Sequence, residues 1–187
     1  MSGPISWAMS LALVDPDIDP IPDFVEPLEA WRVWRVAMRD GRVVLQSLFL
    51  GAVWEPAAPL VAFCHGGHRS RWPPWRKKPN EHPAPELDCR CGIYGVQSVA
   101  AARSYLETPP LLCRDDRVIG RVALWGTVVE GPFGWRASHA YPLELFIPAP
   151  IVLGGLRRRA YVEEILVALE AYRVPVDLVR PSALTAG

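Results

Sequence analysis

The segment HPAPELDCRCGIY, residues 82–94, gathers an unusual density of soft metal ligands. Cys89 and Cys91 are two positions apart, so in an extended segment both sulfur atoms point to the same side. A histidine opens the segment, and a further cysteine lies upstream, at the end of an expected strand. Zinc in proteins prefers four ligands in a tetrahedron, with thiolate and imidazole favoured. The sequence therefore predicts a zinc site formed by Cys64, His82, Cys89 and Cys91.

Two further histidines compete for the histidine position of this site. His65 and His68 closely follow Cys64, and the C-x3-H spacing from Cys64 to His68 is also suited to chelation. Three cysteines and one histidine leave no open coordination position, which is typical of a structural zinc site. The alternative interpretation is a group of reduced, partly buried cysteines with surface histidines. Cys113 is most simply a small buried hydrophobic residue.

Composition places limits on the class of protein. The chain has 187 residues, 50% of them hydrophobic, and a formal net charge of zero. That length suits one well-buried domain, and the neutral charge argues against general binding to polyanions while allowing a local basic patch. Four cysteines are too few for a secreted disulfide scaffold, and no uncharged apolar run approaches the ~20 residues of a spanning helix. We therefore expect a cytoplasmic protein without a membrane segment.

The sequence divides into a tail and a single domain. Residues 1–27 are predicted to be a flexible tail, because 15–20 alternates acid and proline and so resists helix formation. Residues 28–187 are predicted to form one α+β domain, interrupted by a basic insertion at 65–88 that contains five prolines. A long insertion of this kind is typical of a functional loop, of disorder or of a metal-clipped segment.

Strand patterns account for most of the predicted domain. Strands are expected at residues 30–36, 43–50, 60–64, 117–130, 135–140, 143–147 and 176–179. Asp40-Gly41 predicts a tight hairpin turn between the first two of these strands. Gly120 and Gly126 interrupt the longest one, and interior glycines often mark bulges or sharp bends.

Two helices complete the expected secondary structure, at residues 96–106 and about 159–172. The second carries one apolar stripe, formed by Val162, Ile165, Leu166 and Leu169. Consecutive hairpins, rather than alternating strands and helices, favour an α+β fold. We expect a small, bent, mostly antiparallel, barrel-like sheet with two helices and a zinc-stapled loop.

The basic insertion interleaves cations with tryptophans. Arg71, Trp72, Trp75 and Arg76 are the residues most suited to a nucleic-acid contact, because cations engage phosphates and tryptophans stack on unpaired bases. The alternative is a solvated loop whose tryptophans fold back onto the body. A basic run this short is weak evidence for nucleic acid by itself.

Aromatic side chains also concentrate on the hairpin predicted at residues 117–140. Trp125, Trp135 and His139 are candidates for the wall of a pocket of the size of a base or nucleotide. The competing interpretation is that they belong to the core, since large aromatic residues supply much of the buried area of a small domain.

Several short motifs occur together between about residues 30 and 145. They are Cys64, HPAP at 82–85, CRCGIY at 89–94, GRVALWG at 120–126 and GWRA at 134–137. With these motifs the sequence resembles a poorly characterised bacterial family of hypothetical proteins from actinobacteria and their phages. The tail, the basic insertion and the last 40 or so residues lie outside the resemblance. The family has no established activity, so the resemblance implies none.

Among known architectures, the expected barrel looks most like a PUA- or ASCH-type barrel, which implies recognition of RNA, a modified base or a nucleotide. The sequence contains no Ser/His/Asp order, Walker loop or dinucleotide glycine pattern, and it lacks the H-x-E and P-C-x2-C pair of zinc deaminases. We therefore expect a non-enzymatic, zinc-stabilised module that binds nucleic acid or a nucleotide. The alternative is a protein-interaction or regulatory accessory module with a protein partner. An enzyme would require a metal with three protein ligands and a water molecule.

Overall fold

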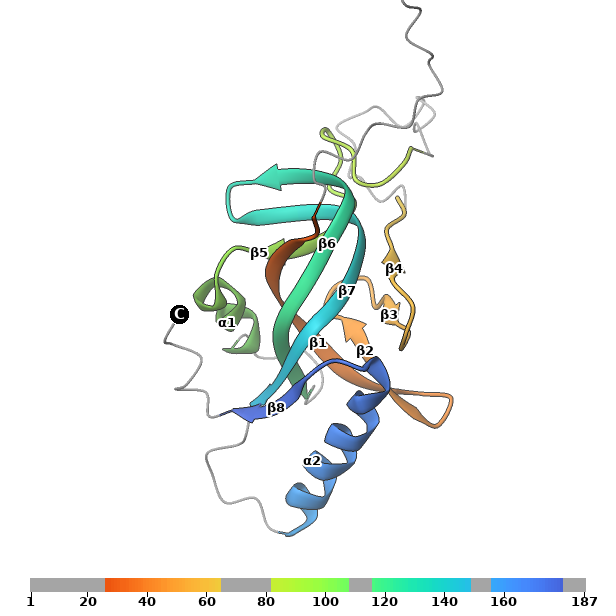
Figure 1. Cartoon of the computed structure of the whole chain (residues 1–187), viewed down its shortest axis with the longest axis vertical. Helices are drawn as coiled ribbons and strands as arrows, with labels where there is room; N and C mark the ends of the chain where they lie inside the picture. The colour runs from red at the N-terminus through yellow and green to blue at the C-terminus, as the bar shows by residue number, and fades with distance from the viewer. Residues whose placement is uncertain (1–25, 65–81, 108–115, 149–155, 180–187) are drawn as a thin grey trace, which may run out of the picture.

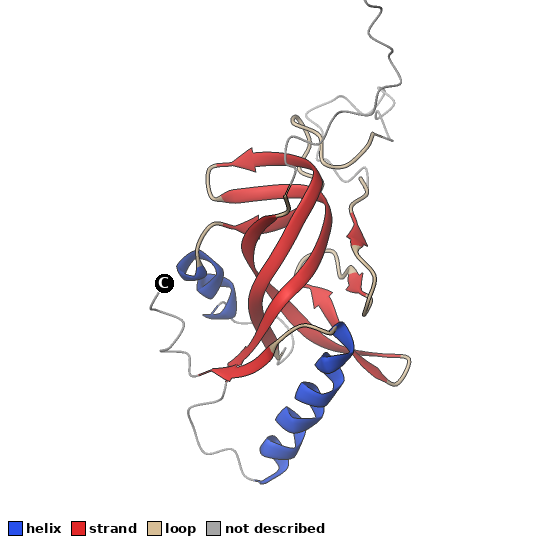
Figure 2. Cartoon of the chain, in the orientation of Figure 1, coloured by secondary structure: helices blue, strands red, loops and turns tan. Residues whose placement is uncertain are grey.

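The computed structural model describes residues 26–64, 82–107, 116–148 and 156–179. Over these ranges the chain forms an α+β structure with eight strands and two α-helices (Figures 1 and 2). The strands are β1 (Leu28–Arg39), β2 (Arg42–Ser47), β3 (Val53–Trp54), β4 (Leu60–Val61), β5 (Ile93–Val96), β6 (Arg117–Gly131), β7 (Gly134–Pro148) and β8 (Val176–Val179). The helices are α1 (Val99–Glu107) and α2 (Leu156–Leu169), and a short 3₁₀ turn, η1 (Glu170–Tyr172), follows α2. No helix within these ranges is long and apolar enough to cross a membrane.

One mostly antiparallel sheet joins all eight strands. β6 pairs along β1 on one side and along β7 on the other. β5 also pairs with both β1 and β7, so that these four strands close a ring of pairings. β2 and β3 extend the sheet from β1, while β4 and β8 add to β7, with β8 parallel to it. This arrangement agrees with the predicted α+β class and with a mostly antiparallel sheet.

The β6–β7 hairpin is the longest element of the sheet (Figure 1). Its register shifts twice, between Arg121 and Val122 and between Trp125 and Val128. The second shift contains Gly126, as predicted from the glycines in this strand. Such shifts bend and twist a strand, which is how two long strands close a curved sheet.

The main core runs along the sheet and includes the end of the molecule occupied by α2. Trp34 and Trp54 meet edge to face there, with ring centroids 5.5 Å apart, and both are fully buried. Ile165 and Leu169 of the predicted apolar stripe insert from α2, and Val162 and Leu166 pack beside them. This packing confirms that the predicted apolar stripe is the face of α2 that meets the core.

A hydroxyl group buried in this core connects distant parts of the chain. The Tyr172 hydroxyl accepts a 2.8 Å hydrogen bond from the backbone N–H of Leu45 and donates to the carbonyl oxygen of Trp54. Burial raises the pKa of Tyr172 to about 12. The 3₁₀ turn η1 is therefore joined to β2 and β3 by hydrogen bonds, which the pattern of apolar residues does not predict.

Several of the predicted element boundaries are wrong, and four of the differences have a clear structural basis. The strand expected to continue to residue 50 ends at Ser47, because Leu50 and Gly51 adopt left-handed conformations that turn the chain. Val96 belongs to β5 and not to α1. Only Leu60 and Val61 of the strand expected at 60–64 pair as a strand. The strands expected at 135–140 and 143–147 are one continuous strand, in which Pro142 falls at a register shift that tolerates its missing N–H.

Candidate metal centre

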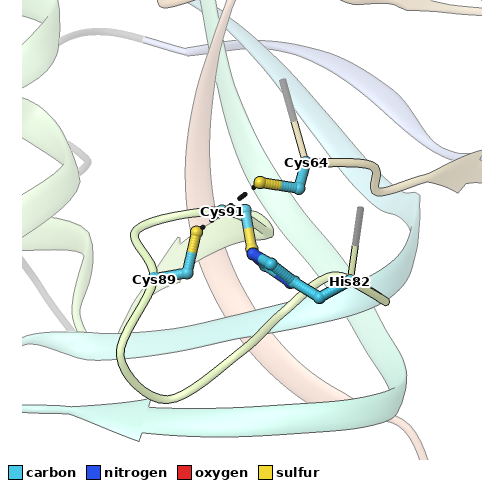
Figure 3. A group of neighbouring side chains, drawn as sticks. All are labelled: Cys64, His82, Cys89 and Cys91. Carbon is cyan, nitrogen blue, oxygen red and sulfur yellow. Dashed lines mark hydrogen bonds between the residues drawn. The ribbon is translucent and has the colours of Figure 1, made fainter. Parts of the chain in front are cut away.

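Cys64, His82, Cys89 and Cys91 form one cluster that could hold a metal ion. Their ligand atoms all lie within 4.8 Å of one another, and Figure 3 shows the four side chains pointing toward a common centre. The chain brings them together from three places. Cys64 follows β4, His82 opens the segment after residue 81, and the two other cysteines directly precede β5. The predicted ligand set is thus assembled in space.

The spacing of the sulfur atoms fits coordination better than a disulfide. The Sγ atoms of Cys64 and Cys89 are 3.7 Å apart, and none of the three cysteines of the cluster is in a disulfide. A disulfide requires about 2.05 Å between sulfur atoms. A tetrahedral ion about 2.3 Å from each sulfur separates two of them by about 3.8 Å. The observed distance is therefore close to one edge of such a tetrahedron.

His82 is oriented by its own backbone neighbourhood. Its Nδ1 lies 2.9 Å from the carbonyl oxygen of Pro83, which can only accept, so Nδ1–H is the donor. This leaves Nε2 as the nitrogen available to a metal, in the arrangement by which second-sphere carbonyl groups fix histidine ligands. The hydrogen bond to Pro83, followed by the neighbouring Cys89, raises the pKa of His82. A metal must therefore displace a proton more firmly held than that of an ordinary histidine.

The Cys91 thiol favours its protonated form when no cation is present. Burial and the neighbouring thiol of Cys89 raise the pKa of Cys91 to about 11. Cys89 is buried and Cys64 is partly buried, so water provides little stabilisation for three adjacent thiolates. A divalent cation reverses this preference, because it binds the thiolate and releases the proton. The cluster is thus electrostatically suited to a cation.

Residues 82–92, called the ligand segment because they carry three of the four ligands, require glycine where they turn, at position 92. Gly92 has φ +117°, and a Cβ built there would lie 3.0 Å from Cβ of Pro85 and 3.1 Å from Cβ of Arg136. A larger residue would meet both a strained backbone and two close neighbours. Gly92 thus lets the chain turn directly beside the ligand cluster.

Arg136 of β7 is a supporting residue that the sequence did not predict for this site. Its Nη1 donates to the carbonyl oxygens of Glu86 at 3.3 Å, Cys91 at 2.9 Å and Cys89. On the other side of the segment, the Tyr94 hydroxyl donates to the carbonyl oxygen of Arg90 at 2.8 Å. Three thiolates and a neutral imidazole around a divalent ion leave one net negative charge, which the guanidinium group lies close enough to offset. The only signal for it in the sequence was the GWRA motif that contains this arginine.

The predicted aromatic wall is brought together only in part. Trp125 and His139 stack, with ring centroids 5.8 Å apart and an interplanar angle of 22°. His139 Nδ1 also lies 2.8 Å from the hydroxyl of Ser138. Trp135 packs instead against the main core, opposite Gly95 of β5. Trp135 is therefore a core residue, whereas Trp125 and His139 form a separate, half-buried stack.

Several predicted residues lie outside the described ranges. These are the alternative ligands His65 and His68, the predicted contact residues Arg71, Trp72, Trp75 and Arg76, and Cys113. Nearly all of the predicted 1–27 tail also lies outside them. The structure does place the two residues that border 65–81, because Cys64 precedes this range, His82 follows it, and both belong to the ligand cluster.

No family model, curated protein or solved structure matches the chain. The resemblance to an actinobacterial and phage family therefore stays a prediction. Function must accordingly be inferred from the geometry of the cluster and of its supporting hydrogen bonds.

Proposed function

We propose that this protein is a non-enzymatic binding module for nucleic acid or a nucleotide, built around a structural zinc ion. The observation that carries the zinc assignment is the convergence of three thiols and one imidazole within 4.8 Å. Soft thiolate ligands with one imidazole in a tetrahedron are typical of zinc, and four protein ligands leave no position for a catalytic water. The proposed role of the ion is to hold the fold together.

The zinc ion would act as a cross-link between distant segments. It would join the end of β4 to the segment before β5, across 25 positions from Cys64 to Cys89. The same cross-link would fix both ends of residues 65–81, the part of the sequence that carries interleaved arginines and tryptophans. Cations and aromatic rings in that order suit a single strand, whose phosphates and unpaired bases they would contact.

A finer fold assignment belongs to the same proposal. We take the ring of pairings through β1, β6, β7 and β5 to be a small bent barrel of the PUA or ASCH type. Two register shifts in the long hairpin support it, since bulges are the devices by which small barrels turn corners. The likeness is one of architecture alone, and the case for a ligand rests on the residues.

The metal part of the proposal is tested by elemental analysis of tag-free protein. Wild type is expected to contain one zinc ion per chain, and Cys91→Ala is expected to contain none. Cys113→Ala serves as the matched thiol control and should keep its zinc. Wild-type protein without a stoichiometric metal would contradict the assignment.

The ligand part is tested with fluorescent single-stranded RNA and DNA at several salt concentrations. The double variant Trp72→Ala/Arg76→Ala should bind more weakly and with a shallower dependence on salt, because one phosphate contact and one stacking ring are removed. Met38→Ala/Arg39→Ala removes one large apolar side chain and one arginine at an exposed hairpin and is the control. Equal, salt-insensitive binding by wild type and both variants would contradict nucleic-acid recognition. Recovery of one stoichiometric protein without nucleic acid would favour the protein-interaction alternative.

A further inference from the structure

A pocket of about 940 Å³ opens beside the metal cluster. Cys64 and the segment before β5, including Cys91, are among the residues that line it. Its walls come from β1, from the turn after β2, from β4, from β5 and from α1. Small-molecule sites occupy roughly 300–1,000 Å³, so this pocket is large enough for a ligand the size of a nucleotide.

Arg32 lies in the wall of this pocket, at an interruption of the sheet. On the edge of β1 that carries β5 and β2, Trp31 pairs with Val96 of β5 and Trp34 pairs with Ser47 of β2. Arg32 falls between these two pairings, and its guanidinium group reaches both neighbouring strands. Nη1 donates to the carbonyl oxygen of Tyr94, and Nη2 donates to the hydroxyl of Ser47 at 3.0 Å.

The positive charge of Arg32 has no counter-charge in the described part of the chain. Its guanidinium group contacts a carbonyl group, a hydroxyl group and the ring of Trp54, whose centroid lies 5.0 Å from the guanidinium carbon. Its Nε is buried and has no hydrogen-bond partner among the described residues. Burial lowers the pKa of Arg32 to about 10, because no neighbouring negative charge in the described ranges offsets the loss of hydration of the guanidinium group. A desolvated cation of this kind is stabilised by an anion that enters the pocket.

The rest of the pocket offers aromatic and aliphatic surface to solvent. Phe49 and Tyr105 meet edge to face on one wall, with ring centroids 6.3 Å apart, and Phe49 is 71% exposed. Val61 and Phe63 contribute from the segment that leads to Cys64, and both are more than half exposed. Contiguous exposed apolar surface is uncommon unless it meets a partner or ligand. Aromatic rings beside a cation suit a ligand that combines a flat ring with an anionic group.

We propose that this pocket binds a single nucleotide unit, with its phosphate at Arg32 and its base against the aromatic walls of Phe49 and Phe63. This inference rests on the proposed function and deepens it, because it adds a site for one nucleotide on described residues beside the strand-binding insertion. A free nucleotide and an unpaired nucleotide within a strand present the same phosphate and base. The pocket is therefore expected to accept either.

The test is calorimetric titration of the metal-bound full chain with the four 5′-mononucleotides, the matching nucleosides and inorganic phosphate. At least one mononucleotide should bind saturably, and its nucleoside should bind about tenfold more weakly or worse, because the charge-assisted contact to Arg32 is lost. Phe49→Ala and Phe63→Ala should each weaken mononucleotide binding by about tenfold. Phe133→Ala, at the equally exposed tip of the β6–β7 hairpin, should leave it unchanged.

Arg32 itself is tested by Arg32→Lys, which keeps the charge but loses the forked donor geometry. Arg32 also donates hydrogen bonds to β5 and β2, so the melting temperature of this variant is measured before its binding is compared. If the variant does not fold, Phe49→Ala and Phe63→Ala provide the test. Weaker binding of the nucleotide with unchanged binding of the nucleoside is the expected result.

The outcomes separate the pocket from the proposed function. Oligonucleotide binding without mononucleotide binding, or mononucleotide affinity equal in Phe49→Ala, Phe63→Ala and Phe133→Ala, would overturn the pocket assignment and leave the module standing. Failure of zinc-loaded protein to bind any oligonucleotide or nucleotide would overturn both. Saturable binding of a synthetic peptide of residues 12–22, sensitive to Phe49→Ala, would assign the pocket to the chain's own acidic segment instead of a nucleotide.

Discussion

The two ends of the long β6–β7 hairpin are held by different kinds of interaction. At one end α2 and η1 pack against β2 and β3 through buried apolar side chains around Trp34, Trp54 and Tyr172. At the other end the ligand segment contributes little apolar burial beyond Ala84, Pro85 and Cys89. It is held by hydrogen bonds from Arg136 and Tyr94 and by a cluster of four potential metal ligands.

This difference implies that the two ends of the hairpin lose their folded structure for different reasons. Apolar packing is present whenever the chain is folded, and its loss destabilises the whole domain. The Cys91 thiol has a raised pKa, and a cation that replaces its proton would hold the four ligands together. Changes at the core end should therefore lower stability without changing metal content, and changes at the ligand end should couple the two.

Truncating the core is expected to have the largest effect. Leu169 is fully buried, and Leu169→Ala should lower the free energy of unfolding by about 2–5 kcal/mol, through lost burial and the cavity left behind. Zinc content per folded chain should stay at the wild-type value. Val167→Ala, on the same helix but 67% exposed, is the control and should differ little from wild type. Loss of zinc in Leu169→Ala would show that the two ends are not independent.

Removing a ligand is expected to come next. Cys91→Ala should lose the metal and about 3 kcal/mol of stability, the magnitude associated with cross-linking a loop of this length. For a domain of this size that corresponds to a fall of about 6–12 °C in Tm. Chelator-treated wild type should melt at the same temperature as the variant. A variant that melts as wild type while lacking metal would exclude a stabilising role for the site.

The Tyr172 hydroxyl should contribute less, and its contribution should depend on pH. Tyr172→Phe leaves the N–H of Leu45 and the carbonyl of Trp54 without this partner, which costs about 1–3 kcal/mol. Because folding raises the pKa of Tyr172 from 10.0 to about 12, the stabilisation is fully present below pH 10. It is lost as pH rises from about 10 to about 12, since only the unfolded chain then releases the proton.

Urea unfolding of wild type and Tyr172→Phe at pH 8 and pH 11 measures this effect. The difference in stability between the two proteins should shrink at the higher pH. A difference that grows with pH would mean that the hydroxyl is not buried as described.

The smallest effect on stability is expected for Arg136→Gln. The variant loses charge and most of the donors that hold the carbonyl groups of the ligand segment. Metal affinity, measured by competition with a chromophoric chelator, should fall by about 10–100-fold, as is usual for second-sphere partners. At saturating zinc its Tm should remain near that of wild type. Arg121→Gln, which removes an exposed ion pair with Glu29, should leave metal affinity unchanged.

The ligand cluster could be predicted because metal binding depends on the type of residue, which is read directly from the sequence. Soft ligands such as Cys89 and Cys91 are rare, and their concentration in one segment indicates a common partner wherever the segment lies. The Asp40-Gly41 turn was predictable for a similar reason, since both residues adopt the positive φ that this pair favours. Periodicity likewise identified the buried face of α2.

The supporting contacts could not be predicted because they depend on which strands meet. Arg136 reaches Cys89 across 47 positions, and Tyr172 reaches Leu45 across 127. In the sequence Arg32 is one polar residue in a strand, and its partly buried place beside both β5 and β2 depends on how these strands pair with β1. The strands expected at 135–140 and 143–147 are continuous through Pro142, because the register shift that accommodates this proline is a property of the pair of strands and not of either strand.

The assignment of a closed structural zinc site is most directly tested by X-ray absorption at the zinc edge of the purified, metal-loaded protein. We predict a four-coordinate shell of three sulfur atoms at about 2.3 Å and one nitrogen at about 2.0 Å. A shell with fewer than three sulfur atoms, or with an oxygen ligand from water, would contradict a closed site at Cys64, His82, Cys89 and Cys91.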